Sequence, residues 1–203
     1  MMKKILLKVA ITVCSLAAFA SANAEVPISF AVQFGYTAPQ GSWFKGDKGS
    51  DFAKFGLGGD IDVLWHLEQF DYKLGVGVTF NSALMFYGDL DNFSDTGFYG
   101  LSLYGIKGQW RFFNSKVSPY GALSLGLSRF ATPDYTMNGK VVVEGQSAFG
   151  FGIRPEVGVE FGVFFLSAGY LIPMKYSVYE GMDSESAGNL QINMGLRFSL
   201  FRR

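Results

Sequence analysis

Much of this chain consists of segments of about ten residues in which large apolar residues alternate with small or polar ones. The segment 149–161 is the clearest case. Its apolar row comprises Phe149, Phe151, Ile153, Val157, Val159 and Phe161. Its polar row comprises Gly150, Gly152, Arg154, Glu156, Gly158 and Glu160. Successive side chains of a strand point to opposite faces, so this pattern predicts a β-strand with one apolar and one polar face.

Eight segments of this kind follow one another along the chain. They lie at 28–37, 54–67, 71–81, 99–112, 123–127, 149–161, 164–172 and 189–200. In the fourth segment the apolar row changes phase after Leu103, and we interpret this change as a β-bulge. The sequence leaves open the register of this segment and the next one.

The connections between the segments alternate between short and long. Short turns are expected near 68–69, 114–118 and Gly162, and long loops are expected at 38–51, 88–96, 131–147 and 173–187. Asn138-Gly139 in the third long loop is typical of a type I′ turn, which predicts a protruding hairpin. This arrangement predicts an all-β fold, an eight-stranded antiparallel up-and-down transmembrane β-barrel.

The composition favours a membrane barrel over a soluble one. Charged residues make up only 17% of the chain, and glycine occurs 26 times. A soluble lipocalin-type barrel would turn its polar rows to water, where glycine would weaken the strands. In a membrane barrel, the apolar rows meet lipid and the small residues fill a narrow lumen. Nucleic-acid binding is not expected, because 17 basic residues are balanced by 17 acidic ones.

The N-terminal residues have the features of a secretory signal peptide. Lys3, Lys4 and Lys8 precede a short apolar run, and Ala22-Asn23-Ala24 is a small-x-small cleavage site. We therefore expect a signal peptide at 1–24 and a barrel at 25–203. The one cysteine, Cys14, lies within the signal peptide, so no disulfide or thiolate metal site is expected in the mature protein.

Aromatic residues gather near both ends of the expected strands, as in the interfacial girdles of membrane barrels. The group near the short turns is Trp65, Tyr72, Trp110 and Phe198. The group near the long loops is Tyr36, Phe55, Phe86 and Tyr170.

This layout resembles the small outer-membrane β-barrel superfamily, which includes the membrane domain of outer membrane protein A, protein X and opacity-type surface proteins. The segment with Asn193, Gly195, Phe198 and Leu200 looks like the C-terminal signal that the barrel-assembly machinery recognises. It departs from the family pattern because it ends in Arg202-Arg203 rather than in an aromatic residue. The resemblance implies a monomer in the outer membrane of a Gram-negative bacterium, in contact with outer-membrane lipid and lipopolysaccharide.

Charged residues on the polar rows are candidates for a network inside the lumen. They are Lys54, Asp60, Asp62, Lys73, Arg154, Glu156, Glu160 and Arg197. Unpaired ions in a narrow lumen are costly, so we expect ion pairs. Our hypothesis is a salt-bridged plug that closes the pore, and the alternative is a small porin-like channel.

The chain offers little for catalysis. The resemblance also covers barrels that modify lipid A, which need a histidine beside a serine. The lone histidine, His66, is followed two residues later by Glu68 and not by a serine. The pair Asp183-Ser184 belongs to a long loop at the other end of the barrel, beyond the roughly 3 Å needed for proton transfer. We therefore expect His66 to be a hydrogen-bonded lumen or rim residue, with no catalytic site, no metal and no cofactor.

The four expected long loops carry ten acidic and four basic residues, a net charge of −6. Asp89, Asp91 and Asp95 are candidate oxygen ligands for a divalent cation that bridges to lipopolysaccharide phosphates. An EF-hand is excluded, because Ser94 stands where its loop requires glycine. The expected role is non-enzymatic. It is structural or surface-interactive, in adhesion or envelope integrity, and an extracellular protein partner would bind through the loops.

Overall fold

The computed structural model describes residues 25–44, 53, 55–87, 97–137, 140–179 and 184–201. The expected signal peptide at 1–24, Lys54 and the acidic residues Asp89, Asp91 and Asp95 lie outside these residues. No helix within the described ranges is long and apolar enough to span a membrane.

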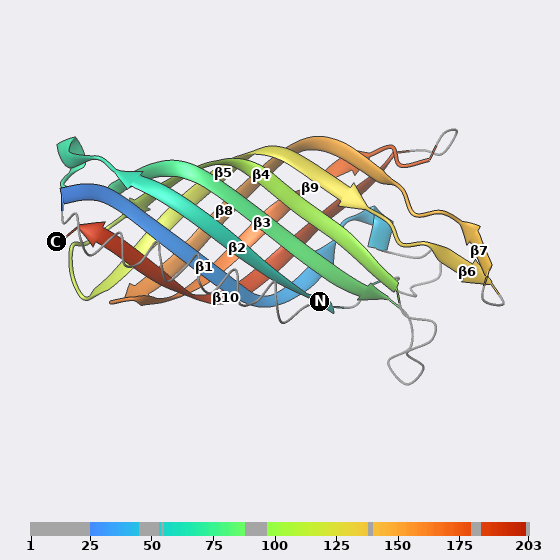
Figure 1. The fold of residues 1–203 in the computed structure, drawn as a ribbon, viewed down its shortest axis with the longest axis horizontal. Coiled ribbons are helices and arrows are strands. Elements are labelled where there is room, and N and C mark those ends of the chain that lie inside the picture. The colour runs from blue at the N-terminus through green and yellow to red at the C-terminus, as the bar shows by residue number, and fades with distance from the viewer. Residues whose placement is uncertain are drawn as a thin grey trace.

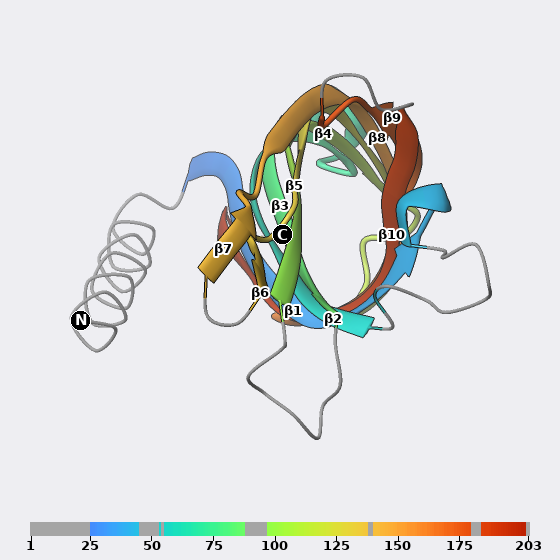
Figure 2. The same ribbon diagram turned by 90° about the vertical axis from the view of Figure 1, so that its right-hand side faces the viewer.

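Eight antiparallel strands close into a barrel (Figures 1 and 2). The barrel strands are β1 (Glu25–Gln40), β2 (Phe55–His66), β3 (Leu74–Tyr87), β4 (Gly97–Arg111), β5 (Val117–Ala131), β8 (Ser147–Phe161), β9 (Phe164–Tyr176) and β10 (Glu185–Phe201). Each strand pairs with its neighbour in sequence, and β1 pairs with β10 to complete the closure. The predicted eight-stranded up-and-down barrel is therefore confirmed. Closure gives every strand a partner on both sides, so no strand lies at a free edge.

The two ends of the barrel differ as the connection lengths predict. The short connections span 67–73, 112–116 and 162–163, and the first contains the short helix η2 (Glu68–Phe70). They lie at the left end in Figure 1, where β10 also ends. By analogy with bacterial barrels this end faces the periplasm. Gly162 has φ +66° in the two-residue turn between β8 and β9, a conformation that favours glycine.

The opposite end carries the expected hairpin. It forms a separate two-stranded sheet of β6 (Tyr135–Met137) and β7 (Lys140–Val143), which projects beyond the barrel (Figure 1). The barrel strands reach further toward this end than predicted, because β1 continues to Gln40 and β9 to Tyr176. A short helix, η1 (Ser42–Phe44), follows β1.

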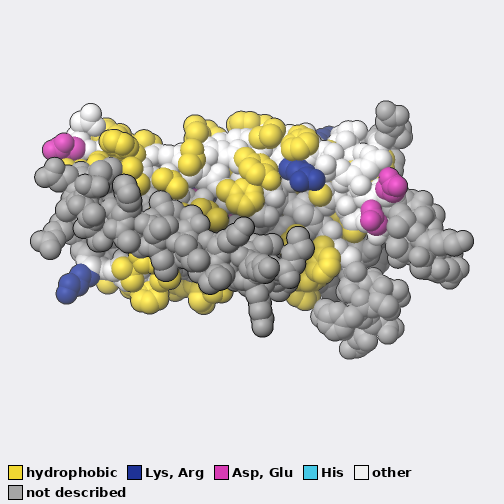
Figure 3. Space-filling model, viewed as in Figure 1, with side chains coloured by type: hydrophobic (Ala, Val, Ile, Leu, Met, Phe, Trp, Pro, Cys, Tyr) yellow, Lys and Arg dark blue, Asp and Glu magenta, His cyan; other side chains and the backbone are white. Residues whose placement is uncertain are grey.

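The apolar rows point away from the lumen. Phe34, Ile106 and Val157 are 68%, 65% and 64% exposed, whereas the polar rows are largely buried. Hydrophobic side chains accordingly cover much of the wall of the barrel in Figure 3. This orientation contradicts a soluble barrel, which would enclose its apolar rows, and it matches a lipid-facing surface.

Strand β4 does not contain the expected bulge. It pairs continuously with β3 and β5, with no shift in register. Leu101 and Leu103 point into the lumen and are fully buried, while Tyr104 and Ile106 on the same strand face outward. The apolar row changes phase because the lumen itself becomes apolar toward the loop end. The expectation of a small, polar interior therefore holds only for the periplasmic part of the barrel.

Candidate functional site

The middle of the lumen contains a cluster of five charged side chains from β2, β4 and β8. Lys107 Nζ lies 2.7 Å from Asp62 and 3.1 Å from Glu156. Arg154 lies 2.9 Å from Asp60 and 2.6 Å from Glu156. All five side chains are buried, with at most 1% of the side chain exposed. We refer to Asp60, Asp62, Lys107, Arg154 and Glu156 as the central cluster.

Neutral side chains complete the hydrogen bonding of the central cluster. Thr79 donates to Asp62 at 2.6 Å, and the Tyr120 hydroxyl donates to Glu156 at 2.9 Å. Gln33 and Asn81 both donate to Asp60. Such donors offset the loss of hydration that makes buried carboxylates unfavourable. The polar rows of the strands therefore meet in one connected network.

A second group of charges lies nearer the short-turn end. Glu160 forms ion pairs with Arg197 and with Arg111, the second at 3.5 Å. The side-chain amide of Gln109 donates a hydrogen bond to Glu160 at 3.1 Å. We call Arg111, Glu160 and Arg197 the lower cluster. Together the two clusters contain four buried acids and four buried Lys or Arg residues. The ions buried in the described part of the lumen therefore balance in formal charge.

Of the eight charges proposed for the lumen network, six lie in these clusters, Lys54 lies outside the described residues, and Lys73 does not belong to either cluster. Lys73 lies in the turn before β3, where its backbone carbonyl accepts a hydrogen bond from the Arg111 N–H at 3.0 Å. Lys107 and Arg111, which are absent from the expected network, supply cations in its place. The sequence contains a pattern that identifies both as inward-facing residues, because Lys107 and Arg111 alternate with the outward-facing Ile106 and Trp110. The change of phase after Leu103 already places both residues on the inward row, but the expected network included no residue of this strand.

His66 forms a hydrogen-bonded pair that the sequence did not reveal. Its Nε2 lies 2.7 Å from the Ser29 Oγ, and its Nδ1 lies 3.2 Å from the Tyr72 carbonyl oxygen. A carbonyl can only accept, so Nδ1 carries a proton, and the serine hydroxyl donates to Nε2 of the neutral ring. The expected hydrogen-bonded role of His66 is confirmed. The serine comes from the neighbouring strand β1 and not from the residues that follow the histidine.

The loop end of the lumen is filled by aromatic rings. Phe44 of η1 is 3% exposed and packs edge-on against Tyr99 and Phe130, with ring centroids 5.6 and 5.9 Å apart. Trp43 contacts Phe130 at 5.1 Å, and Tyr176 contacts it at 5.5 Å. Edge-to-face and tilted rings at these distances are favourable contacts. We refer to Trp43, Phe44, Tyr99, Phe130 and Tyr176 as the aromatic plug.

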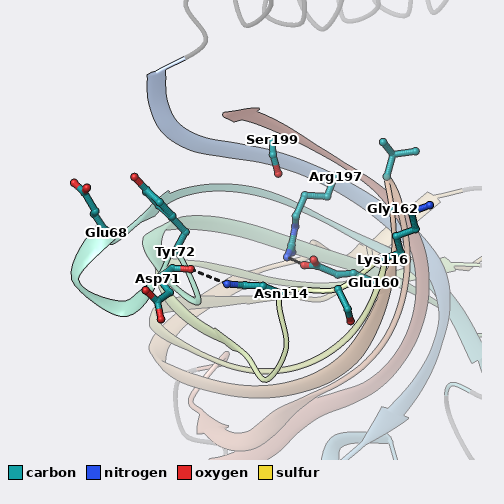
Figure 4. Close-up of a pocket in the computed structure, with 11 residues that line it drawn as sticks. Glu68, Asp71, Tyr72, Asn114, Lys116, Glu160, Gly162, Arg197 and Ser199 are labelled. Atoms are coloured by element: carbon teal, nitrogen blue, oxygen red, sulfur yellow. Dashed lines mark hydrogen bonds and ion pairs between the residues drawn. The ribbon is translucent and has the colours of Figure 1, made fainter. Parts of the chain in front are cut away.

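Most of the aromatic residues proposed for the girdles lie on the outer wall. Trp65, Trp110, Tyr36 and Tyr170 are between 37% and 51% exposed. Phe86 is partly exposed, stacks with Phe55 and packs edge-on against Phe98. Tyr72 does not belong with them. It lies in the turn between β2 and β3 with φ 59°, is half-buried and borders a cavity at the barrel end (Figure 4).

The proposed assembly signal lies in β10, opposite β1. Asn193 is buried in the lumen beside Gly35, and Gly195 pairs with Gln33. A Cβ on Gly195 would lie 2.5 Å from the Val32 carbonyl oxygen, so this position requires glycine. Phe198 is partly exposed next to Phe30, and the side chain of Leu200 lies outside the described residues.

The acidic loops are only partly described. Asp134 is exposed, and its carboxylate accepts a hydrogen bond from the Gly145 N–H at 2.6 Å. Within the described ranges, no three His, Cys, Asp or Glu side chains are grouped as metal ligands. The divalent-cation hypothesis for Asp89, Asp91 and Asp95 concerns residues outside these ranges and stays a prediction.

Comparisons with known proteins support the fold. No protein-family profile matches the sequence, and no curated protein matches it. Among solved structures, Neisserial surface protein A matches with a TM-score of 0.56 and 15% identity, over 84% of this chain and 96% of that one. Ail, the attachment invasion locus protein of Yersinia pestis, in complex with the heparin analogue sucrose octasulfate, matches with a TM-score of 0.52 and 18% identity, over 84% and 99%. Together with the apolar outer wall, this barrel fold places the chain in the outer membrane of a Gram-negative bacterium.

Proposed function

We propose that this protein is a non-conducting, non-enzymatic barrel that holds its long loops on the cell surface for binding. The observation that carries the proposal is the filled lumen, in which the aromatic plug lies above the two charged clusters. An ion would have to break several buried ion pairs and also move packed rings. The porin-like alternative has less support for this reason.

The enzyme alternative also has weak support. Ser29 and His66 form a hydrogen-bonded pair, but the two residues are only 1% and 0% exposed. They lie at the short-turn end of the barrel, whereas the lipid A substrate of the related enzymes lies in the outer leaflet. The pair is better explained as part of the structural hydrogen bonding of the lumen.

The loop charge indicates the kind of partner. Ail was solved with a sulfated heparin analogue. The segments 38–51, 88–96, 131–147 and 173–187, which include the loops and the strand ends beside them, carry ten acids against four bases, so a sulfated polyanion would be repelled. The expected partner is a protein or other macromolecule with a basic surface, and the aromatic plug provides a rigid support for the loops that bind it.

Two experiments test the two parts of this function. In planar bilayers the purified protein should show no stepwise conductance, and robust open-state currents would contradict a sealed barrel. On intact cells the protein should bind a basic polypeptide such as polylysine and not heparin. A variant with Asp134, Glu144 and Glu185 replaced by Asn or Gln should bind polylysine less. Equal binding by the variant would count against the loop surface.

We further propose that residues 1–24 are removed on export, that the segment 193–200 docks on the assembly machinery, and that the barrel is a monomer. N-terminal sequencing of the outer-membrane protein should begin at Glu25. Replacement of Phe198 by Ser should reduce the amount of heat-modifiable barrel, and light scattering in detergent should give the mass of one chain.

A further inference from the structure

One stretch of the barrel wall is not closed by strand pairing. The register between β8 and β9 holds six residue pairs and ends at Glu156↔Gly169, whereas every other neighbouring pair of barrel strands shares ten or more. Beyond this point, residues 147–155 of β8 pair with β5 and residues 170–176 of β9 pair with β10, but these two stretches, both fully described, do not pair with each other. We call the two facing edges of 147–155 and 170–176 the seam.

Pro155 explains why the pairing ends where it does. The Phe112 N–H donates to the Pro119 carbonyl at 3.0 Å, so Pro119 turns its backbone groups toward β4. Backbone groups alternate in direction along a strand, and Leu123 therefore also faces β4. Pro155 lies opposite Leu123 in the β5–β8 register, so its nitrogen faces β9. This nitrogen has no N–H to donate to Tyr170, the next residue of β9 in the register, and the pairing stops.

The seam lies in the outer half of the membrane-spanning band. A strand rises about 3.3 Å per residue and tilts by about 40°, so each residue adds about 2.5 Å of height. Glu156 is then about 13 Å above the periplasmic end of β8 at Phe161, in a band about 25 Å tall. The backbone groups of Ile153 and Phe151 face β9 like those of Pro155, and they lie at the depth of the outer leaflet. In hydrocarbon such groups need a hydrogen-bonding partner.

Side chains close the seam toward the lumen. A Cβ on Gly152 would lie 2.6 Å from the Leu103 side chain and 3.5 Å from that of Leu171. A Cβ on Gly150 would lie 3.3 Å from the Tyr176 ring. These three side chains are at most 2% exposed and belong to the apolar core of the loop end. A ligand bound in the seam would therefore stay in the barrel wall and leave the lumen sealed.

Basic side chains lie beside the loop end of the seam. Arg129 of β5 is exposed on the outer wall opposite Phe149 of β8, and its guanidinium carbon lies 6.0 Å from the centroid of that ring. Lys175 of β9 is exposed on the other side of the seam. Figure 3 shows a Lys or Arg side chain among the hydrophobic ones toward this end of the wall. Counted from Val117 at the start of β5, Arg129 is about 30 Å up the strand, which is the level of the outer headgroups.

We propose that the seam binds the lipid A part of a lipopolysaccharide molecule, with an acyl chain along the edges of β8 and β9 and a phosphate at Arg129. Lipid A belongs to the outer leaflet, its phosphates are anionic, and some of its acyl chains are amide-linked and hydroxylated. The phosphates complement Arg129, and the amides and hydroxyls can pair with the backbone groups that Pro155 leaves unpaired. A phospholipid has phosphate and acyl chains but no such amide. The inference does not rest on the surface role proposed for the loops.

Native mass spectrometry of the mature protein, refolded without lipid in a neutral maltoside detergent, tests the site with purified hexa-acylated lipid A. We expect one saturable lipid A per barrel, bound several-fold more tightly than phosphatidylglycerol. Arg129→Gln should weaken lipid A binding about tenfold, which corresponds to about 1.4 kcal/mol. Lys116→Gln is the matched control, because it removes an exposed charge at the periplasmic end, and its affinity should equal that of the unchanged protein.

Pairs of introduced cysteines test whether the two strands are unpaired at the seam. Residues 25–203 contain no cysteine, so each introduced pair reports on its own position. Val159→Cys with Leu166→Cys lies in the paired part of the register and should form a disulfide readily, because paired Cα atoms are about 5.5 Å apart. Ile153→Cys with Ile172→Cys would be opposite each other if the register continued, and should form a disulfide about tenfold more slowly or not at all.

Pro155→Val restores the missing N–H. It should extend the pairing of β8 with β9, speed the disulfide between positions 153 and 172, and weaken lipid A binding while the barrel stays heat-modifiable. Absence of saturable binding, equal binding of phosphatidylglycerol, or unchanged lipid A affinity in a folded Arg129→Gln or Pro155→Val variant would overturn the proposal. Equal disulfide formation by the two cysteine pairs would show a closed wall and overturn it as well. A lipid-free dimer in the mass spectra would assign the seam to a second copy of this chain instead.

Discussion

Lys107 and Glu156 approach to 3.1 Å across the lumen, although their strands, β4 and β8, are separated in the barrel by β5. The lysine also pairs with Asp62 of β2 at 2.7 Å. One buried ammonium group thus joins strands that do not hydrogen-bond to each other. The central cluster therefore connects opposite walls of the barrel in addition to filling it.

Removal of Lys107 should destabilise the barrel strongly. Lys107→Met leaves three carboxylates of the central cluster with Arg154 alone, so we expect a loss of about 3–5 kcal/mol in the free energy of unfolding. The double variant Lys107→Met, Glu156→Gln restores the original charge of the cluster and should recover part of that loss. Urea unfolding in detergent, followed by tryptophan fluorescence and heat-modifiability, measures both. A double variant less stable than the single one would contradict this account.

Gly169 provides a steric test of the same cluster. A Cβ at this position would lie 2.4 Å from Nη2 and 2.6 Å from Cζ of Arg154, which is held in place by Asp60 and Glu156. Gly169→Ala should therefore cost about 1–3 kcal/mol through displacement of the guanidinium. Gly108→Ala is the control, because a Cβ there meets nothing within 4 Å, and its effect should stay within about 0.5 kcal/mol. Equal unfolding midpoints for the two variants would argue against a tightly held Arg154.

Phe44 tests whether the aromatic plug contributes to stability. Phe44→Ala removes a ring that is 3% exposed and should cost about 3–5 kcal/mol, as for other buried phenylalanines. Phe34→Ala on the lipid-facing wall, where the side chain is 68% exposed, should cost clearly less. The Phe44 variant should still be silent in planar bilayers, because the central cluster remains intact. Open channels in this variant would instead show that the aromatic plug, and not the central cluster, blocks the flow of ions.

The three tryptophans test the position of the barrel in the bilayer. Trp65 and Trp110 are 51% and 40% exposed on the outer wall near the short turns, and Trp43 packs on Phe130 at the loop end. In variants with one tryptophan each, brominated lipids should quench Trp65 and Trp110 most strongly from positions close to the headgroups. Trp43 should be quenched least. Strong quenching of Trp43 from the centre of the bilayer would contradict the placement.

The order of apolar and polar residues is enough to define the strands and their two faces. Alternation with period two places Phe151 and Val157 outward and Arg154 and Glu156 inward, and it does so for every strand whose rows keep one phase. The alternating lengths of the connections determined which ends of the strands belong together. In hydrocarbon, these two patterns leave closure into a barrel as the arrangement that pairs the backbone.

Which inward residues meet depends on how the strands pair and close into the barrel. Ser29 meets His66 because β1 pairs with β2, and Lys107 meets Glu156 because closure brings non-neighbouring strands face to face. The alternation in a strand fixes the face of a side chain but not its height in the barrel or its partner across the lumen. The apolar interior at the loop end was missed for a related reason. Leu101 and Leu103 are as apolar as lipid-facing residues, and only the closed barrel shows that they point inward to pack with Phe130.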